Sequence, residues 1–404
     1  MLTPGRSGAC DVAPAADSAA TPGFHFLQTP GPTNVPGRVL RAMGAPTIDH
    51  RGPQFASLTL EILAGMQELL RTDQPVVIFP ASGTGAWEAA LVNTLTPGAR
   101  VLAFDTGHFA RLWAEVASRL GFDAELIDGE WSRGVSESEL ERRLSADPRG
   151  ELAAVLLVHN ETSTGVVNDI ASCRAAIDRS GHPALLLVDT VSSLGSIDYR
   201  HDEWRVDVTV GASQKGLLLP SGLSFNVPSE RALAAAKVAG GARAYWDWRP
   251  VLEANSQGYF PYTPPTNLLF GLREALSMLR EEGLDAVFVR HSRHGAATRC
   301  AVDAWGLQTV CQESERASAV VTAVLAPDGS DEREIRRVIL DRYGVSLGAG
   351  LGALAGKAFR IGHIGDFNDA MLIGVLGTVE LGLGAAGVPC DRSGVAAAVR
   401  WLAG

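Results

Sequence analysis

Lys215 has the clearest potential for covalent chemistry in this sequence. It is the only lysine among residues 1–236, and it follows the strand-like run at residues 206–210 and the short segment Ser213–Gln214. Small and apolar residues come after it, so burial would disfavour the ammonium, and a neutral amine is the form that makes a Schiff base with an aldehyde. The alternative is a surface lysine just past a strand.

Asp189 is the second candidate, because it ends the buried strand-like run at residues 184–188. A carboxylate at the mouth of a buried strand loses hydration energy unless a positive group meets it. The alternatives are a helix cap and a structural hydrogen-bond acceptor.

A small-residue turn, Ser82-Gly83-Thr84-Gly85, leads from a strand-like run into a helical pattern. Amides at such a helix start can hold a phosphate dianion, although a tight turn needs the same glycines without any ligand. A dinucleotide turn would need a third glycine where this chain has Glu88. An early phosphate cradle, an Asp and a later Lys together indicate pyridoxal phosphate, which pairs a Schiff-base lysine with an acidic partner for its ring nitrogen.

The elements that must position these residues alternate along the chain. Strand-like runs at residues 76–79, 100–104, 153–158, 184–188 and 206–210 alternate with helical patterns at residues 86–95, 110–121, 137–144 and 170–180. Strands buried on both faces between helices predict an α/β fold with a mostly parallel sheet, whose ligands bind at the carboxyl ends of the strands.

The rest of the chain suggests a second, smaller unit. An aromatic and proline-rich loop is expected over residues 242–265, then a long helix over 267–282, and later strands over 316–325 and 359–363. The expected organisation is a mobile arm (1–24), a large cofactor-binding domain (25–283) and a smaller C-terminal α+β domain (284–404).

Composition excludes several classes of partner. The 404 residues carry a net charge of −10 without a run of Lys or Arg, which argues against a nucleic-acid partner. No apolar run predicts a membrane span or a signal-peptide core. The five cysteines show no C-x-x-C spacing, so we expect no metal site, free thiols and a cytoplasmic location.

Several motifs add a family resemblance that extends from about residue 29 to residue 387. They are TPGPTNVP at residues 29–36, TIDHR at 47–51, HNETSTG at 159–165, DEW at 202–204, SQKG at 213–216, PYTPP at 261–265, NLLFGLREAL at 267–276, RHGAATR at 293–299 and FRIGH at 359–363. The sequence resembles the class V branch of the fold type I pyridoxal-phosphate enzymes, and within it the serine-glyoxylate aminotransferases, relatives of alanine-glyoxylate aminotransferase.

The resemblance implies a role for each matching residue. Lys215 anchors the cofactor and then moves the proton from the substrate α-carbon, and Asp189 keeps the ring nitrogen protonated. Further cofactor contacts are implied for Ser82, Gly83 and Thr84 (phosphate), Gln214 (phosphate), Thr263 (phosphate, from the neighbouring subunit), Phe109 and Val191 (the two ring faces) and Thr162 (the ring oxygen edge). Arg360 is implied to grip the substrate carboxylate, with Gly31 adding a backbone contact.

Some positions depart from the family pattern or stay without a role. Phe260 replaces a tyrosine that supplies a phosphate hydrogen bond in alanine-glyoxylate aminotransferase, and Tyr262 is the candidate substitute. Core packing stays the alternative for Phe109, and an internal salt bridge stays the alternative for Arg360. No role is assigned to four further residues, which are His50, Arg51, His159 and His363.

The implied activity is a homodimeric transaminase that moves the amino group of L-serine to glyoxylate by a ping-pong mechanism. Aspartate, alanine and ureidoglycine are alternative donors. A cysteine desulfurase would need a mobile-loop cysteine, and residues 344–356 contain none. A nicotinamide-dependent dehydrogenase leaves Lys215 unexplained, and a binding module without turnover has no need to retain Lys215, Asp189 and Arg360 together.

Overall fold

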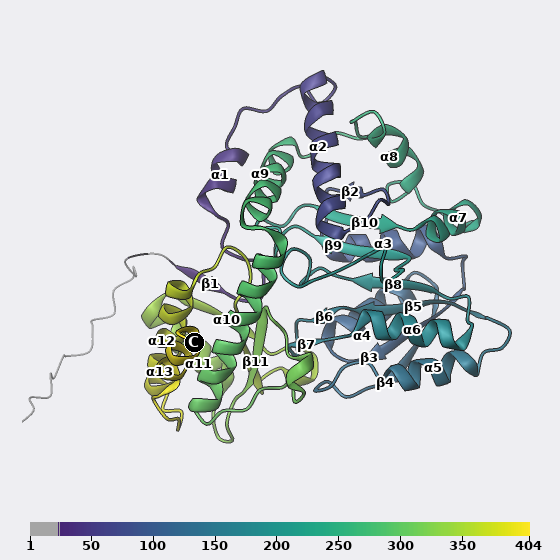
Figure 1. The fold of residues 1–404 in the computed structure, drawn as a ribbon. Helices are drawn as coiled ribbons and strands as arrows, with labels where there is room; N and C mark the ends of the chain where they lie inside the picture. The colour runs from purple at the N-terminus through teal and green to yellow at the C-terminus, as the bar shows by residue number, and fades with distance from the viewer. Residues whose placement is uncertain (1–22, 24) are drawn as a thin grey trace, which may run out of the picture.

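A seven-stranded sheet forms the centre of the large domain. The computed structural model describes residues 23 and 25–404, so the expected arm at residues 1–24 lies almost wholly outside the described residues. The strand order is β2-β10-β9-β8-β5-β3-β4 (Figure 1). The strands are β2 (Val77–Phe79), β3 (Arg100–Asp105), β4 (Asp123–Asp128), β5 (Leu152–Val158), β8 (Leu185–Asp189), β9 (Val208–Ala212) and β10 (Ser224–Pro228).

Most of this sheet is parallel, as predicted. The parallel pairs are β3/β4, β3/β5, β5/β8 and β8/β9, whereas β10 runs antiparallel to both β9 and β2. The fold is α/β with a mostly parallel central sheet. The sequence prediction missed β4, whose residues are largely exposed or half-buried and therefore lack a buried run, and it missed β10.

Alternate residues of the central strands enter two different apolar cores. Leu186 and Val188 of β8 pack into one core with helices on that face, and Leu185 and Leu187 pack into the other. Helices α2 (Pro53–Leu70), α5 (Glu137–Ser145), α6 (Ile170–Ser180) and α9 (Thr266–Glu282) supply residues to the first core. Helices α3 (Gly83–Thr94), α4 (His108–Arg119), α7 (Glu230–Val238) and α8 (Trp248–Asn255) supply the second.

The prediction of a loop over residues 242–265 is wrong for its middle part, residues 248–255. Helix α8 forms there, with Asp247 capping it by accepting a hydrogen bond from the Arg249 N–H. The buried side chains of Trp248 and Val251 attach the helix to the core. Tertiary packing thus stabilises a short helix in a segment whose proline and aromatic content favoured a loop.

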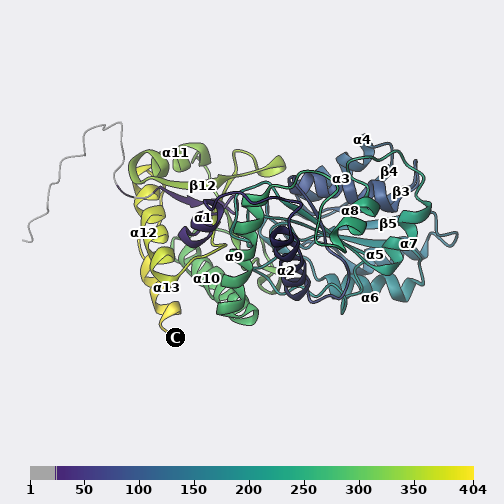
Figure 2. The ribbon, with the colours of Figure 1, turned by 90° about the horizontal axis from the view of Figure 1, so that it is seen from above.

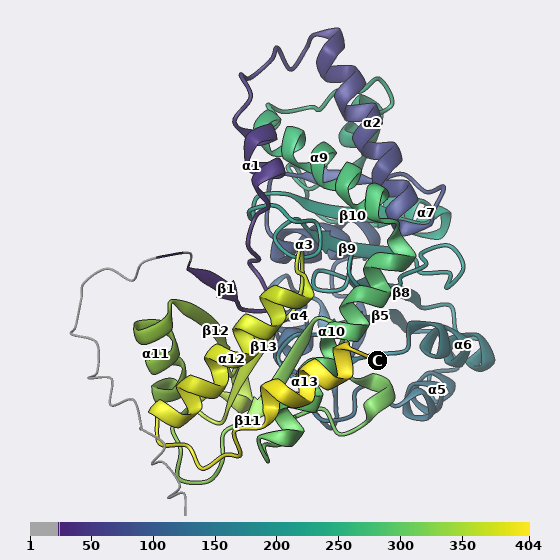
Figure 3. The ribbon, with the colours of Figure 1, turned by 60° about the vertical axis from the view of Figure 1, so that its left-hand side comes forward.

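A four-stranded sheet and four helices make up the smaller domain (Figures 2 and 3). The strand order is β1-β12-β13-β11, with β1 (Phe26–Gln28), β11 (Val321–Leu325), β12 (Val345–Ala349) and β13 (Ala358–Gly362). The helices are α10 (Leu284–Ala304), α11 (Glu332–Tyr343), α12 (Asp369–Ala385) and α13 (Gly394–Leu402). The strand expected over residues 316–325 begins only at Val321, and Arg316 instead belongs to a short 3₁₀ turn, η1 (Ser314–Arg316).

Strand β1 corrects the expected assignment of residues from 25 onward to the large domain. It pairs in parallel with β12, so the chain starts in the small sheet before it enters the large domain. The paired residues Phe26 and Val345 are 319 positions apart in the sequence, so no local pattern could predict their pairing. The segment after β1 then runs past the large sheet, and this places Pro30 and Gly31 beside Lys215.

The remaining elements are short. They are α1 (Gly37–Met43), the two-stranded pair β6 (Asn160–Glu161) and β7 (Val166–Val167), and the 3₁₀ turn η2 (Gly352–Leu354). Across the part of the chain that the structure describes, no helix has the length and apolar character needed to cross a bilayer.

Candidate active site

Lys215 is buried at the end of β9, with 8% of its surface exposed. Its Nζ donates a hydrogen bond to the Pro30 carbonyl at 2.9 Å and lies 5.9 Å from the centre of the Phe109 ring. Burial, and then the positive charge of Arg360, lower the pKa of Lys215 to about 8. A substantial fraction of this amine is therefore neutral near physiological pH, as a nucleophilic lysine requires.

Gly31 makes the close approach to Lys215 possible. Its φ is +108°, and a Cβ at this position would lie 2.7 Å from Cγ of Lys215. Only glycine satisfies both the backbone conformation and the contact.

Asp189 ends β8 and is also buried. Its Oδ1 accepts the backbone N–H of Val191 at 2.6 Å, and its Oδ2 accepts the indole N–H of Trp87 at 2.8 Å. Burial raises the pKa of Asp189 to about 6, against the effect of these two donors. The carboxyl is thus poised to share a proton with a basic group in the pocket.

The start of α3 forms one wall of the site. Ser82 is the N-cap residue, and the first hydrogen bonds back to its carbonyl come from Gly85 and Ala86. The N–H groups of Gly83 and Thr84 come before this first turn and have no acceptor within the helix. They can therefore donate to an anion, which the helix dipole also favours. A Cβ at Gly83 would lie 2.7 Å from Cγ2 of Val191, so a side chain here would close the gap.

These groups meet in one cavity of about 290 Å³. Its lining residues are Gly31, Pro32, Ser82, Gly83, Thr84, Trp87, Phe109, Val158, Asn160, Thr162, Asp189, Val191, Ser192, Gln214, Lys215 and Ser221. The buried Oε1 of Gln214 has no hydrogen-bond partner among the described residues. A helix start with free N–H groups, a carboxylate and a lysine amine in one enclosed space fit pyridoxal phosphate.

Arg360, on β13 of the small domain, is not among the lining residues but contacts one of them, Thr162. Its Nε donates to the Ala349 carbonyl at 2.8 Å and its Nη1 donates to the Thr162 carbonyl at 3.1 Å. Burial lowers the pKa of Arg360 to about 10. The expected alternative of an internal salt bridge is not observed among the described residues, so this buried cation has carbonyl partners and capacity for a carboxylate.

Comparisons with known proteins identify the family of this chain. The family model for aminotransferase class V matches residues 25–359. The chain belongs to the class V aminotransferases. It is 48% identical over 388 residues to the serine--glyoxylate aminotransferase of Methylorubrum extorquens, covering 94% of this chain and 96% of that protein. It is 43% identical to the L-aspartate--glyoxylate aminotransferase of Paracoccus denitrificans, covering 91% and 94%.

A solved structure supports the fold assignment. The ureidoglycine-glyoxylate aminotransferase from Bacillus subtilis superimposes with a TM-score of 0.87 at 27% identity, covering 96% of this chain and 100% of that chain. The fold type I aminotransferase architecture is therefore established, and pyridoxal phosphate is the cofactor of the class V aminotransferases.

Ten of the site residues expected from the sequence line the cavity together. They are Gly31, Ser82, Gly83, Thr84, Phe109, Thr162, Asp189, Val191, Gln214 and Lys215. Arg360 contacts this wall through Thr162. Thr263 is exposed and lies outside the lining, and its contact from a neighbouring subunit stays a prediction. The individual roles of all these residues also stay predictions.

Tyr262 does not offer its hydroxyl to the cavity. The hydroxyl donates to the Ile78 carbonyl at 2.7 Å, and the ring stacks near Phe79 and Tyr245. The idea that Tyr262 replaces the family tyrosine at Phe260 is therefore not supported by this arrangement. Its hydrogen bond instead attaches the segment before α9 to strand β2.

Two buried histidines have structural partners. His159 shares a hydrogen bond with Ser193 Oγ at 2.9 Å and packs against Tyr199 and Trp204. Burial lowers its pKa to about 4, so it is neutral at physiological pH. His363 is bonded through its two ring nitrogens to the Ala319 carbonyl and Thr322 Oγ1.

Sequence reasoning missed Trp87 and Glu161. Glu161 is fully buried, and its carboxylate accepts N–H bonds from Ala110 at 3.1 Å and Ser163 at 3.1 Å, and the Ser163 hydroxyl at 2.6 Å. It thereby caps the start of α4 beside Phe109. The only sequence signal was the position of Glu161 within the HNETSTG motif.

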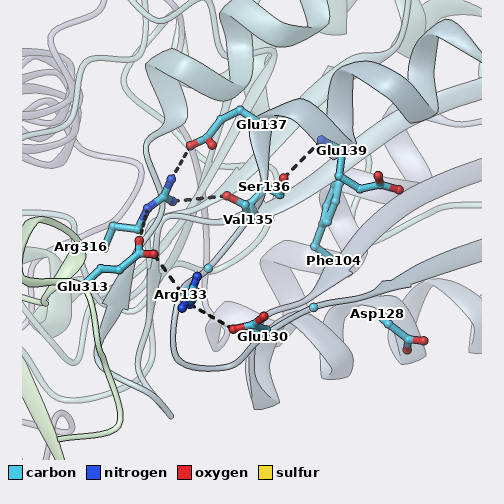
Figure 4. A pocket seen from close by; sticks show the side chains of 12 residues that line it. Phe104, Asp128, Glu130, Arg133, Val135, Ser136, Glu137, Glu139, Glu313 and Arg316 are labelled. Atoms are coloured by element: carbon cyan, nitrogen blue, oxygen red, sulfur yellow. Dashed lines mark hydrogen bonds and ion pairs between the residues drawn. The ribbon is translucent and has the colours of Figure 1, made fainter.

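A second cavity, of about 540 Å³, lies between the turn that precedes α5 and η1 (Figure 4). Its cations are already paired, since Arg316 contacts Glu137 at 2.7 Å and Arg133 contacts Glu130 at 3.1 Å. None of the predicted site residues lines it. Within the part of the chain that the structure describes, no cluster of three or more His, Cys, Asp or Glu could hold a metal ion.

The lowered pKa of Lys215 predicts how cofactor loading depends on pH. We expect the rate at which the cofactor-free protein takes up pyridoxal phosphate to rise with pH and to level off above about 8, since only the neutral amine attacks the aldehyde. Stopped-flow absorbance measures this rate. A rate that keeps rising to about pH 10, as for a lysine with its ordinary pKa, would contradict the burial argument.

Proposed function

We propose that this class V aminotransferase transfers the amino group of L-serine to glyoxylate, giving hydroxypyruvate and glycine by a ping-pong mechanism. The observation that carries the proposal is the convergence of Lys215, Asp189 and the start of α3 on one cavity. The serine--glyoxylate aminotransferase that matches at 48% identity supports the choice of substrates.

Pyridoxal phosphate supplies an aldehyde that takes up the amino group and a ring that holds the electrons released when the α-proton leaves. The N–H groups at the start of α3 and the side-chain amide N–H₂ of Gln214 would donate hydrogen bonds to its phosphate. Lys215 would hold the cofactor at its aldehyde carbon, and its amine would carry the proton from the substrate α-carbon. Asp189, in the same cavity lining, would keep a proton at the ring nitrogen.

Arg360 orients the substrate by binding its α-carboxylate. Both serine and glyoxylate have this group, and glyoxylate has almost nothing else, so one arginine serves both half-reactions. Its two carbonyl hydrogen bonds fix the guanidinium against Thr162 and Ala349, which limits the entropy lost when the substrate binds.

Replacing Arg360 by lysine is expected to raise the KM for serine and for glyoxylate by roughly 10²-fold, because a lysine keeps the charge but loses the two-pronged geometry. Steady-state kinetics with both substrates measures the change. For serinol, an amine without a carboxylate, the KM of the variant should equal that of the wild type.

The matched control is Arg299→Lys, since Arg299 is half-buried in the same domain and donates to the Ser318 carbonyl, away from the cavity. Its KM values should stay at the wild-type level. An Arg360→Lys enzyme with unchanged KM values would remove Arg360 from the substrate site.

We also propose that two copies form a homodimer in which Thr263 reaches the partner's phosphate site. The exposed position of Thr263, outside the cavity of its own chain, supports this arrangement. We place the enzyme in the cytoplasm because Cys173, Cys300, Cys311 and Cys390 are free thiols. Sedimentation equilibrium of the wild-type protein tests the dimer.

Aspartate is the strongest alternative donor, because a relative at 43% identity is named an L-aspartate--glyoxylate aminotransferase. Alanine and ureidoglycine remain further alternatives. The test compares kcat/KM for serine, aspartate and alanine at a fixed glyoxylate concentration, with the keto-acid product and glycine quantified separately. Serine should give the highest value, and a higher value for aspartate would replace serine in the proposal.

A further inference from the structure

Trp87 contacts the carboxylate on which the cofactor chemistry depends. Its Nε1 donates to Asp189 Oδ2 at 2.8 Å, while the Val191 N–H donates to Oδ1 at 2.6 Å. Trp87 also lines the cavity. Each carboxylate oxygen thus accepts one N–H from an uncharged group and retains capacity for a second partner in the cavity.

Packing fixes the orientation of the indole. Only 3% of Trp87 is exposed, and its ring stacks on Trp113 of α4 with centroids 5.8 Å apart and planes 14° apart. The Trp113 indole N–H is buried and has no partner among the described residues. The two stacked tryptophans belong to one core, but the N–H of Trp87 donates to Asp189 whereas that of Trp113 meets no acceptor among the described residues.

We propose that Trp87 is a positioning residue that keeps the proton shared by Asp189 and the cofactor's ring nitrogen on the nitrogen. This inference rests on pyridoxal phosphate binding, but not on the identity of the amino donor. The shared proton has two resting places, the ring nitrogen and a carboxylate oxygen, and it favours the more basic one. A carboxylate that accepts N–H bonds is a weaker base than one that accepts none.

The buried position of Asp189 explains why its basicity must be lowered by hydrogen-bond donors. Burial is the largest cause that raises the pKa of Asp189, which is about 6 even with both N–H donors present. Removing the indole N–H leaves Oδ2 without its donor in the protein and makes the carboxylate more basic. The proton then moves toward Oδ2, the ring nitrogen becomes neutral, and the ring is a poorer acceptor of electrons.

The test compares Trp87→Phe with the matched control Trp113→Phe. Both variants replace a stacked indole by a smaller ring, but only the first removes an N–H that meets Asp189. Each holoenzyme is loaded with ¹⁵N-ring-labelled pyridoxal phosphate, and the ¹⁵N chemical shift reports whether the ring nitrogen is protonated. Wild type and Trp113→Phe should show a protonated nitrogen, and Trp87→Phe should shift toward the neutral position.

A second measurement separates proton control from packing. Dissociation constants are measured for pyridoxal phosphate and for 1-deazapyridoxal phosphate, which has a C–H in place of the ring nitrogen. In Trp87→Phe the preference for pyridoxal phosphate over the analogue should fall about tenfold, since a charge-assisted hydrogen bond becomes a neutral one. Trp113→Phe should keep the wild-type preference.

Three results would decide against the inference. A protonated nitrogen in Trp87→Phe, or an equal loss of affinity for both ligands, would assign Trp87 to packing alone. A preference lost equally in Trp113→Phe would assign the effect to the stacked pair. If the wild-type protein binds no pyridoxal phosphate, it is the proposed function that fails, before any comparison of variants.

Discussion

Replacing Lys215 by alanine is expected to lower kcat/KM for transamination by at least about 10⁴-fold, because the variant loses both the nucleophilic anchor and the base at the substrate α-carbon. Lys215 is the one side-chain amine in the cavity lining, with a pKa lowered by burial to about 8. Steady-state assays with serine and glyoxylate measure the loss. Added methylamine should restore part of the rate by supplying a free base.

Lys237→Ala is the control for this variant. Lys237 is exposed on α7 and is not part of the cavity lining, and its removal changes the net charge by the same amount. It should leave kcat/KM unchanged. A Lys215→Ala protein that is folded, holds pyridoxal phosphate and turns over near the wild-type rate would show that the reacting amine lies elsewhere.

Asp189→Asn is expected to lower kcat by roughly 10²–10³-fold, because an amide holds no proton at the ring nitrogen and the charge that develops there is no longer balanced. The substitution should slow the step that removes the α-proton of the substrate. Serine deuterated at the α-carbon should therefore show a larger isotope effect on kcat in the variant than in the wild type.

Asp207→Asn separates this effect from general damage to a buried carboxylate. Asp207 is 2% exposed, and it pairs with Arg231 at 3.1 Å and accepts the Leu186 N–H at 2.8 Å, away from the cavity. This variant should lose stability but keep the wild-type isotope effect. A wild-type kcat in Asp189→Asn would exclude the proposed role of Asp189.

The reacting residues could be predicted from the sequence because each directly follows a strong local pattern. Asp189 ends a strand with apolar residues on both faces, and Lys215 follows the next strand in the sheet. Parallel strands bring their carboxyl ends to the same edge, so two residues 26 positions apart in sequence meet in one cavity. The small residues from Ser82 to Gly85 predicted the start of a helix at this position.

The supporting residues could not be predicted in this way. Trp87 and Asp189 are 102 positions apart, and the sequence alone does not show which of eight tryptophans meets the carboxylate. Strand β1 enters the small sheet through a pairing with β12 that no local pattern encodes. Glu161 lies within a recognisable motif, yet its task of capping α4 appears only once the two segments are adjacent.

The central claim is that the cavity around Lys215 holds pyridoxal phosphate and passes an amino group from a donor to glyoxylate. The most direct test follows the visible absorption spectrum of the purified holoenzyme while L-serine and then glyoxylate are added in one cuvette. We predict an absorption band that serine bleaches and glyoxylate restores, with hydroxypyruvate and then glycine released. A band that serine, aspartate and alanine all leave unchanged would contradict it.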